Sequence, residues 1–313
     1  MTATIGSRLG SAVAAPSAPY CSFEPKDEFN KLLEANVHPP NYVNPAPIEE
    51  YDLVVIGAGV AGLLSVITAK WLGKKCALIE GHAMGGDCLN IGCVPSKALI
   101  AASRALANVR SCSDFGIRLP PGAITIDFGH VMQRMRKIRA EISHHDSVQR
   151  YAKEFCEHVF VGHGEFSPSD ANTVIVRGDD RSSRVLRFRK AMIASGAAAS
   201  IPPELHGIPH LTNANFFNLT ELPPRMIVLG CGPIGLELAQ AMSVFGCQVT
   251  CISKYDHIMP KEDPAASALV AEQMVADGTY GHAERYITGN GRSRFELWIV
   301  DNTSCSLSTR LFC

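Results

Sequence analysis

Two cysteines, Cys88 and Cys93, are the residues of this chain whose type and spacing most directly indicate chemistry. The four residues between them let the chain fold back through one helical turn, which brings both thiols within reach of a disulfide. Pro95 suits the first turn of a following helix, and a helix N-terminus lowers a thiol pKa by about one unit. The spacing alone favours two buried structural cysteines, but the position beside a nucleotide-binding strand-turn-helix unit favours a redox-active disulfide, which we predict.

A glycine-rich turn lies upstream of this cysteine pair. Residues 51 to 56 are apolar and β-branched, and Gly57, Gly59 and Gly62 follow in a G-x-G-x-x-G pattern before an apolar helical stretch. The first glycine permits a tight turn, the second lets backbone amides reach a pyrophosphate, and the third lets helix and strand pack closely. Glu80 ends the next predicted strand, where a carboxylate accepts hydrogen bonds from a ribose. The unit is predicted to bind a dinucleotide; a tight turn without a ligand is the alternative.

The same pattern recurs downstream. Residues 226 to 229 are a predicted strand, Gly230, Gly232 and Gly235 open a predicted helix, and residues 248 to 252 are the next strand. Two such units imply two nucleotides, and a redox disulfide lies between them in the sequence. One nucleotide should be a flavin that exchanges electrons with the sulfurs, and the other a nicotinamide dinucleotide.

The ribose position of the second unit departs from the usual pattern. Ser253 stands where an acid is expected, and Lys254 follows it. Loss of the carboxylate removes repulsion against a 2′-phosphate, with which Lys254 could pair. This favours NADPH over NADH, whereas Asp256 nearby and the alternative of a solvated loop lysine argue against it.

Length and composition limit the classes of function. The chain has 313 residues, enough for about two domains, with 46% hydrophobic and 19% charged residues. Its formal net charge of -1 gives no electrostatic reason to bind nucleic acid or an anionic membrane. The 11 cysteines are scattered, and no metal-ligand motif is present, so no metal site is predicted and small molecules are the expected partners.

The string G-G-D-C-L-N-I-G-C-V-P-S-K at residues 85 to 97, together with both turns, carries a family resemblance. Over residues 51 to 278 the chain resembles the class I pyridine nucleotide-disulfide oxidoreductases, which include glutathione reductase, dihydrolipoamide dehydrogenase and mercuric reductase. The resemblance implies that Cys93 lies beside the flavin and that Cys88 is the interchange sulfur that attacks the substrate. It also implies that Lys97 lies near flavin N5 and pairs with Glu237.

The implied reaction is electron transfer from NAD(P)H through FAD to the Cys88/Cys93 disulfide, then to a small-molecule disulfide or a thiophilic metal such as Hg(II). The segments at residues 162 to 166 and 193 to 196 resemble later strands of the FAD domain, and residues 139 to 148 resemble the mercuric-reductase-like branch. The candidate cofactor-binding residues are Gly57, Gly59, Gly62, Glu80, Gly86, Lys97, Gly164, Ser195, Gly196, Gly230, Gly232, Gly235, Ser253 and Lys254.

The predicted fold is α/β, with an FAD-binding Rossmann-like domain followed by a second, incomplete NAD(P)-binding Rossmann-like domain. The expected parts are an N-terminal extension at residues 1 to 50, the FAD-binding domain at 51 to 222, the partial NAD(P)-binding domain at 223 to 278, and an atypical tail at 279 to 313. Up to Pro47 the extension is expected to be an extended arm. Its first 23 residues weakly resemble an organelle transit peptide, with a plain disordered tail as the alternative, so both a cytoplasmic and an organellar location are compatible.

After residue 278 the sequence departs from the family pattern. The family's return to the FAD domain and its dimerisation domain, which carries a His-Glu pair, have no recognisable counterpart here. The homodimer typical of the family would therefore lack its usual interface. We expect either an incomplete enzyme, or a non-catalytic FAD- or nucleotide-binding fragment or faulty gene model of a longer enzyme.

Overall fold

The computed structural model describes residues 22–120, 122–178, 182–205, 208–253, 255, 257–281, 288–289 and 292–293. The chain divides into two compact units, the first comprising Met1–Pro95 with Met132–Leu219 and the second Ser96–Val131 with Thr220–Cys313. Each unit contains one of the two glycine-rich turns. The domain boundaries drawn from the sequence stay predictions.

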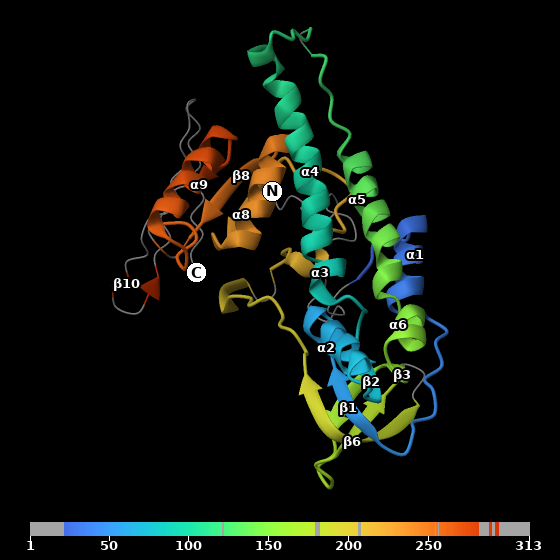
Figure 1. Cartoon of the computed structure of the whole chain (residues 1–313). Coiled ribbons are helices and arrows are strands. Elements are labelled where there is room, and N and C mark those ends of the chain that lie inside the picture. The colour runs from blue at the N-terminus through green and yellow to red at the C-terminus, as the bar shows by residue number, and fades with distance from the viewer. Residues whose placement is uncertain are drawn as a thin grey trace. The chain divides into compact units, whose positions relative to one another are not determined.

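The first unit is built on a six-stranded sheet in the order β3-β2-β1-β6-β5-β4 (Figure 1). In that order the strands are β3 (His158–Val161), β2 (Cys76–Glu80), β1 (Tyr51–Ile56), β6 (Ser183–Ile193), β5 (Thr173–Arg177) and β4 (His163–Phe166). The first four are parallel to their neighbours, and the last two pair antiparallel. The predicted strand-turn-helix unit therefore lies at the centre of a mainly parallel sheet.

Apolar residues cover both faces of this sheet. Along β2, Leu78 packs into a core with Leu63 of helix α2 (Val60–Trp71), whereas Ile79 packs on the opposite face. Because strands buried on both faces need apolar side chains at every position, β2 is a continuous apolar run that ends at Glu80. Helix α2 forms the crossover between β1 and β2 and packs against both strands.

The arm expected to be extended instead contains helix α1 (Glu28–Val37). The side chain of Asp27 caps this helix by accepting a hydrogen bond from the Asn30 amide at 2.9 Å. Leu33 and Val37 are completely or almost completely buried in the core of the first unit. The expectation of an extended arm was wrong because this short amphipathic segment gains a helix from burial of its apolar face.

Further helices connect the strands. They are α3 (Gly86–Asn90), α4 (Cys93–Arg110), α5 (Phe128–Ser143), α6 (Val148–Glu154) and α7 (Asn213–Phe216). Short 3-10 helices occur at Cys112–Phe115, His144–Asp146 and Pro203–Leu205. The cysteine motif spans α3 and the start of α4, as the predicted fold-back requires.

The second unit has a three-stranded parallel sheet in the order β7-β8-β9. Its elements are β7 (Arg225–Leu229), α8 (Pro233–Phe245), β8 (Gln248–Ile252), α9 (Pro264–Ala276) and β9 (Tyr280–Gly281). Helix α8 packs against β7 and β8, and α9 packs against β9 (Figure 1). A separate two-stranded pair joins β10 (Thr288–Gly289) to β11 (Arg292–Ser293). The predicted α/β class with two Rossmann-like units is confirmed.

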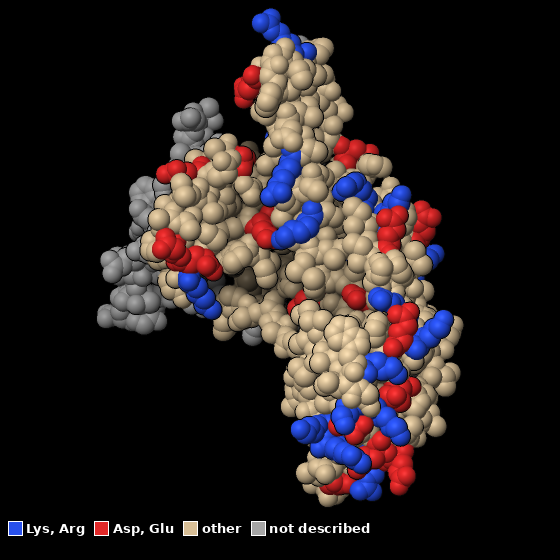
Figure 2. Space-filling view, in the orientation of Figure 1, with Lys and Arg blue, Asp and Glu red and all other residues tan. Residues whose placement is uncertain are grey.

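Charged side chains of both signs share the visible surface. Where Figure 1 shows β1 and β6, basic and acidic side chains intermingle in Figure 2, in keeping with the formal net charge of -1. Among the described residues, no helix combines the length and apolar character needed to cross a membrane.

Candidate functional site

The first glycine-rich turn tolerates no side chain at two of its glycines. Gly57 has a φ of +101°, and a Cβ atom there would lie 2.2 Å from the carbonyl oxygen of Ala194. A Cβ atom at Gly62 would lie 1.8 Å from the carbonyl oxygen of Gly57. The tight turn and the close helix-strand packing predicted for these glycines are therefore both present.

The Glu80 carboxylate stabilises the first turn by accepting hydrogen bonds from backbone amides. One carboxylate oxygen accepts a hydrogen bond from the Ala58 amide at 2.6 Å, and the other accepts one from the His82 amide at 2.7 Å. Glu80 is buried, so these bonds satisfy a desolvated carboxylate. Gly59 is the N-cap of α2, and no side chain caps that helix end. A helix N-terminus of this kind suits a phosphate group.

The cysteine motif packs directly on the first turn. Gly86 has a φ of +57°, and a Cβ atom there would lie 2.6 Å from the Cα atom of Gly59. The neighbouring Gly85 amide donates a hydrogen bond to the Ala58 carbonyl at 2.9 Å. Two glycine backbones therefore meet where a dinucleotide would approach the turn. The absence of side chains at this contact lets the cysteine motif pack closely on the turn.

The two cysteines of the motif are neighbours in space. Both are exposed free thiols, and their side chains are joined by a hydrogen bond. Cys88 lies within α3, and Cys93 is the first residue of α4. The close approach expected from the C-x-x-x-x-C spacing is confirmed.

The acidification expected for these thiols is wrong for Cys88. Local burial of its sulfur, followed by the hydrogen bond and charge of Cys93, raises the pKa of Cys88 to about 11, although the residue as a whole is exposed. The five-residue helix α3 provides too little dipole to offset these effects. Cys88 therefore holds its proton at neutral pH.

Asp146 is a neighbour of the motif that the sequence did not identify. Its Oδ2 atom would lie 3.1 Å from a Cβ atom on Gly85, and its charge contributes to the raised pKa of Cys88. Burial also raises the pKa of Asp146 itself. Residues 139 to 148 carried a branch resemblance but no signal that placed a carboxylate beside the cysteine.

Arg139 supports the loop between the two cysteines. Its side chain is buried, with Nη1 donating to the Asn90 carbonyl at 2.6 Å and Nη2 to Oδ1 of Asn30 at 2.7 Å. Asn90 in turn donates to the carbonyls of Met84 and Gly86, both at 2.9 Å. The loop is therefore fixed by buried hydrogen bonds to residues of α1 and α5, which local motif patterns do not predict.

The second turn repeats the backbone of the first. Gly230 also has a φ of +101°, and its amide donates to the Ile252 carbonyl at 2.8 Å, as Gly57 does to Ile79 at 2.8 Å. A Cβ atom at Gly235 would lie 2.4 Å from the Gly230 carbonyl oxygen, whereas one at Gly230 or Gly232 would meet nothing within 4 Å. The second turn therefore has the predicted shape, and its described neighbours leave more space around it than those of the first turn do.

Ser253 lies at the ribose position of the second unit and is buried. Its hydroxyl accepts a hydrogen bond from the Tyr255 amide at 3.1 Å and forms another with Cys231. Lys254 and Asp256 lie outside the described residues. The preference for NADPH therefore stays a prediction.

The predicted pair of Lys97 and Glu237 is present in the second unit. Lys97 Nζ lies 2.6 Å from Oε1 of Glu237, and the Ser96 hydroxyl donates to Oε2 at 3.3 Å. The side chains are 58% and 38% exposed, so water screens the pair. The pairing is confirmed, and its role beside a flavin stays a prediction.

The remaining candidates occupy different settings. A Cβ atom on Gly57 would lie 3.1 Å from the Ser195 amide, which places Ser195 beside the first turn, and Gly196 follows it with a φ of +69°. Gly164 lies in β4, and a Cβ atom there would lie 3.3 Å from Ile79, so close packing already explains this glycine.

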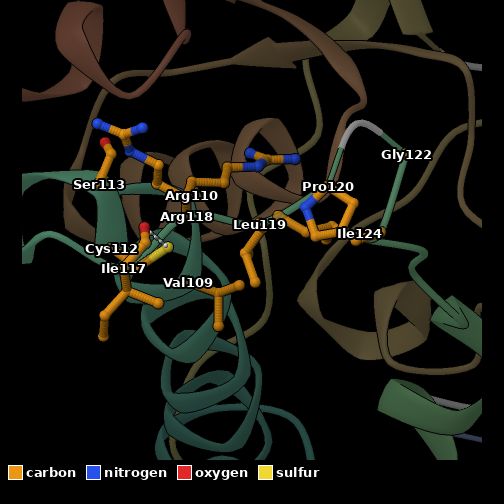
Figure 3. A pocket seen from close by; sticks show the side chains of 11 residues that line it. Val109, Arg110, Cys112, Ser113, Ile117, Arg118, Leu119, Pro120, Gly122 and Ile124 are labelled. Carbon is orange, nitrogen blue, oxygen red and sulfur yellow. Dashed lines mark hydrogen bonds between the residues drawn. The ribbon is translucent and has the colours of Figure 1, made fainter.

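A cavity of about 460 Å³ lies at the end of α4 and the loop that follows it (Figure 3). Arg110 and Arg118 line it together with apolar side chains that include Val109 and Leu119. Arg110 is held by a hydrogen bond of 2.6 Å to the Val244 carbonyl. The lining contains none of the predicted site residues.

Comparisons with known proteins agree with this geometry. The sequence model of the family described as pyridine nucleotide-disulphide oxidoreductase matches residues 51–300. Dihydrolipoyl dehydrogenase of Bacillus subtilis strain 168 is 32% identical over 222 residues, which cover 68% of this chain and 46% of that protein. A mercuric reductase of Lysinibacillus sphaericus is 32% identical over 233 residues, covering 74% of this chain and 41% of the other.

Solved structures show the same likeness. The HOCl-induced flavoprotein disulfide reductase RclA of Escherichia coli is 26% identical and superimposes with a TM-score of 0.59, covering 75% of this chain and 50% of that one. The chain spans about half the length of the relatives it matches. With its cysteine motif docked on the first turn and a family match over most of its length, the chain belongs to the pyridine nucleotide-disulphide oxidoreductase family.

Proposed function

We propose that this chain carries out flavin-dependent electron transfer from NAD(P)H to the Cys88/Cys93 disulfide, and from there to a small-molecule disulfide or a thiophilic metal cation. The observation that carries the proposal is the contact between Gly86 and Gly59. It sets a pair of neighbouring, exposed thiols against a phosphate-binding turn within one compact unit. Dithiol chemistry beside a dinucleotide site is the arrangement that flavin disulfide reduction requires.

The first unit offers the groups that would hold FAD. The uncapped N-terminus of α2 would bind the pyrophosphate, and the Glu80 carboxylate would bind the ribose. Bound flavin supplies two-electron transfer between the nicotinamide and the disulfide. Gly86 lets the cysteine motif pack against the turn that would hold the pyrophosphate.

The second unit would take the nicotinamide dinucleotide. Gly232 is the N-cap of α8, Pro233 occupies its first turn, and no side chain caps this helix end. Lys97 and Glu237 form an exposed ion pair in this same unit.

Thiol-disulfide exchange balances within the proposed pair. The Cys88 thiol gives its proton to solvent, and its sulfur attacks a substrate disulfide, which forms a mixed disulfide, breaks the substrate S–S bond and releases one thiolate. The Cys93 thiol likewise gives its proton to solvent, and its sulfur attacks Cys88 in the mixed disulfide, which forms the Cys88–Cys93 bond and releases the second thiolate. The two protein sulfurs lose two electrons, and the substrate gains them. The exposure of Cys88 suits the first attack.

The names of the relatives support this choice. Dihydrolipoyl dehydrogenases and a mercuric reductase, whose names refer to a dihydrolipoyl group and to mercury, match the chain at similar identity. The second candidate, a non-catalytic FAD- or nucleotide-binding fragment, shares both glycine-rich turns. It differs in requiring no chemistry from the cysteines.

Purified full-length protein distinguishes the two candidates. We expect bound flavin, a long-wavelength absorbance shoulder after two-electron reduction, and NADPH oxidation that depends on lipoamide, glutathione disulfide or HgCl₂. Cys88→Ser and Cys93→Ser should each abolish turnover. Cys112→Ser is the matched control, because Cys112 is partly exposed and its sulfur donates a hydrogen bond to the Ile117 carbonyl of its own loop at 3.4 Å.

If the protein binds flavin but does not oxidise NADPH with any of the three acceptors, the non-catalytic FAD- or nucleotide-binding fragment is favoured. Turnover that survives both serine substitutions would contradict the assignment of the disulfide.

A further inference from the structure

A second pair of neighbouring thiols lies beneath the second glycine-rich turn. Cys231 directly follows Gly230, and Cys251 lies in β8, in register with Val228 of β7. Each residue is only 5% exposed, and their side chains are hydrogen-bonded to each other. The hydroxyl of Ser253 forms a further hydrogen bond with Cys231.

The equivalent positions of the first unit hold inert apolar residues. Ala58 follows Gly57 as Cys231 follows Gly230, and Leu78 is in register with Val55 as Cys251 is with Val228. Both first-unit residues belong to the buried core. In the first unit, one small and one large apolar side chain are therefore enough to pack beneath the glycine-rich turn. The two thiols of the second unit add a chemical capability that packing does not require.

The surroundings favour a reactive thiolate at Cys231. Hydrogen bonds from Cys251 and Ser253 lower the pKa of Cys231 despite the opposing effect of burial. The pKa of Cys251 is raised, because its proton is held in the bond to Cys231 and its sulfur is buried. The two thiols are therefore coupled through the hydrogen bond between them.

The backbone on either side of Cys231 borders open space. Among the described residues, a Cβ atom at Gly230 or Gly232 would meet nothing within 4 Å, whereas the equivalent Gly57 is closed off by Ala194.

We propose that Cys231 and Cys251 form a second redox-active dithiol, which a peroxide or a low-molecular-weight disulfide oxidises to a disulfide that weakens dinucleotide binding at the second turn. The dithiol stands on the cysteine geometry alone, and the effect on binding rests on the proposed function. With hydrogen peroxide, two S–H bonds and the O–O bond break, one S–S bond forms and two water molecules leave. The sulfurs lose the two electrons that the peroxide gains.

The bond would displace the turn. A disulfide holds its sulfurs at about 2.05 Å, well inside hydrogen-bonding separation, so bond formation would draw Cys231 toward β8. The Cys231 carbonyl accepts a hydrogen bond from the Met259 amide at 2.8 Å, and this contact would be strained or lost. The backbone amides of the turn are the groups that face a pyrophosphate, so the shift misplaces them.

A matched control pair exists in the first unit. Cys76 and Cys156 are buried, hydrogen-bonded to each other, and likewise divided into one thiol of lowered and one of raised pKa. Cys76 begins β2, at the end of the strand opposite to the glycine-rich turn. Oxidation of this pair should leave the nucleotide sites undisturbed.

The test uses the full chain in a Cys88→Ser/Cys93→Ser background, which removes the first dithiol. The protein is treated with hydrogen peroxide or glutathione disulfide, mapped by mass spectrometry without reduction, and titrated with NADPH. We expect a cross-linked Cys231–Cys251 peptide and NADPH binding weaker by about tenfold, because small misplacements of binding groups have effects of this size. Dithiothreitol should restore the affinity.

Variants locate the effect. Cys231→Ser and Cys251→Ser should each make NADPH affinity independent of oxidation, whereas Cys76→Ser should keep the full response. The proposal is overturned if Cys231 and Cys251 remain thiols under conditions that oxidise glutathione fully, or if they cross-link without a change in affinity. A reduced chain that binds no NADPH would contradict the proposed function of the second turn, and the peptide map would still decide whether the dithiol forms.

Discussion

The two glycine-rich turns share one backbone and differ in what surrounds it. Gly57 and Gly230 have the same φ of +101° and the same amide hydrogen bond of 2.8 Å to the neighbouring strand. The first turn follows β1, which pairs on both sides, and is closed by Ala194 and Glu80. Among the described strands, β7 of the second turn pairs with β8 alone. The motif therefore specifies the turn's shape, and the neighbouring strands determine how firmly it is held.

The largest contrast in stability is expected when the first glycine of each turn, Gly57 or Gly230, is replaced by alanine. Both substitutions incur about 1–3 kcal/mol of backbone strain at positive φ. Gly57→Ala also places a Cβ atom 2.2 Å from the Ala194 carbonyl oxygen, whereas Gly230→Ala meets nothing within 4 Å. We expect Gly57→Ala to lower the free energy of unfolding of its unit by more than about 4 kcal/mol. Hydrogen exchange of β1 and β7 peptides measures the two units separately.

Gly62→Ala and Gly235→Ala serve as controls for this contrast. In both, the added Cβ atom would lie against the carbonyl of the leading glycine, at 1.8 Å and 2.4 Å. Both should therefore be strongly destabilising. Equal losses for Gly57→Ala and Gly230→Ala would show that the surroundings of the turns do not matter.

The second-largest contrast is expected between Glu80, beneath the first turn, and Ser253, beneath the second. Glu80→Ala leaves the Ala58 and His82 amides without their acceptor, so we expect a loss of about 2–4 kcal/mol of stability and lower flavin content. Ser253→Ala removes one acceptor of the Tyr255 amide and should cost about 1 kcal/mol. Glu80→Gln, which keeps one amide oxygen, should fall between them in chemical denaturation. A Glu80→Ala chain as stable as the parent would contradict the bracing role of Glu80.

The pH dependence of Cys88 is the third test. At pH 9, where an ordinary thiol is half ionised, a pKa of about 11 leaves about 1% of Cys88 as thiolate. Its alkylation by iodoacetamide should therefore keep rising about tenfold per pH unit from pH 7 to 10. Because the folded state favours the neutral thiol, the associated stability is present below the ordinary thiol pKa and is lost as the pH rises toward 11.

Asp146→Asn should shift this profile to lower pH, since it removes a negative charge that raises the pKa of Cys88. Asp114→Asn, in the 3-10 helix after α4, is the control and should leave it unchanged. Peptide mass spectrometry of the alkylated protein follows Cys88 alone. A rate that levels off near pH 9 in the parent chain would refute the raised pKa.

The smallest expected effect belongs to the Lys97–Glu237 pair. Both side chains are well exposed, so Lys97→Met should change thermal stability by less than about 1 kcal/mol. Lys137→Met is the control, because Lys137 forms a similarly exposed pair with Glu141 at 3.8 Å. A large loss of stability for Lys97→Met alone would mean that the pair is structural. A loss of turnover without a loss of stability would support its role in the reaction.

Local patterns predicted much of the fold. The alternation of apolar strand, glycine-rich turn and helix predicted both Rossmann-like units, because the turn depends on local features. Gly57 and Gly230 adopt a φ of +101°, and Gly62 and Gly235 leave room for the carbonyl of the leading glycine. The cysteine spacing likewise predicted the thiol contact across α3 and α4. Such features depend on backbone geometry that the sequence specifies directly.

Features that depend on distant partners escaped the sequence. Helix α1 needed the core of the first unit to bury Leu33 and Val37. Burial and Cys93 raise the pKa of Cys88 most, and the additional contribution of Asp146 comes from a residue that lies far along the chain. The contact of Cys231 with Cys251 became visible only through the register of β7 and β8. In each case the missing information is which segments are adjacent in three dimensions.

The hydrogen bonds of Arg139 set a practical limit on where this protein can be shortened. The family match begins at residue 51, yet Asn30 of α1 accepts from the guanidinium that also holds the Asn90 carbonyl between the two cysteines. Expression from Tyr51 onward would leave a buried cation without that acceptor and open the apolar surface beneath Leu33. The first helix, although outside the recognised family region, is part of the scaffold on which the dithiol loop is mounted.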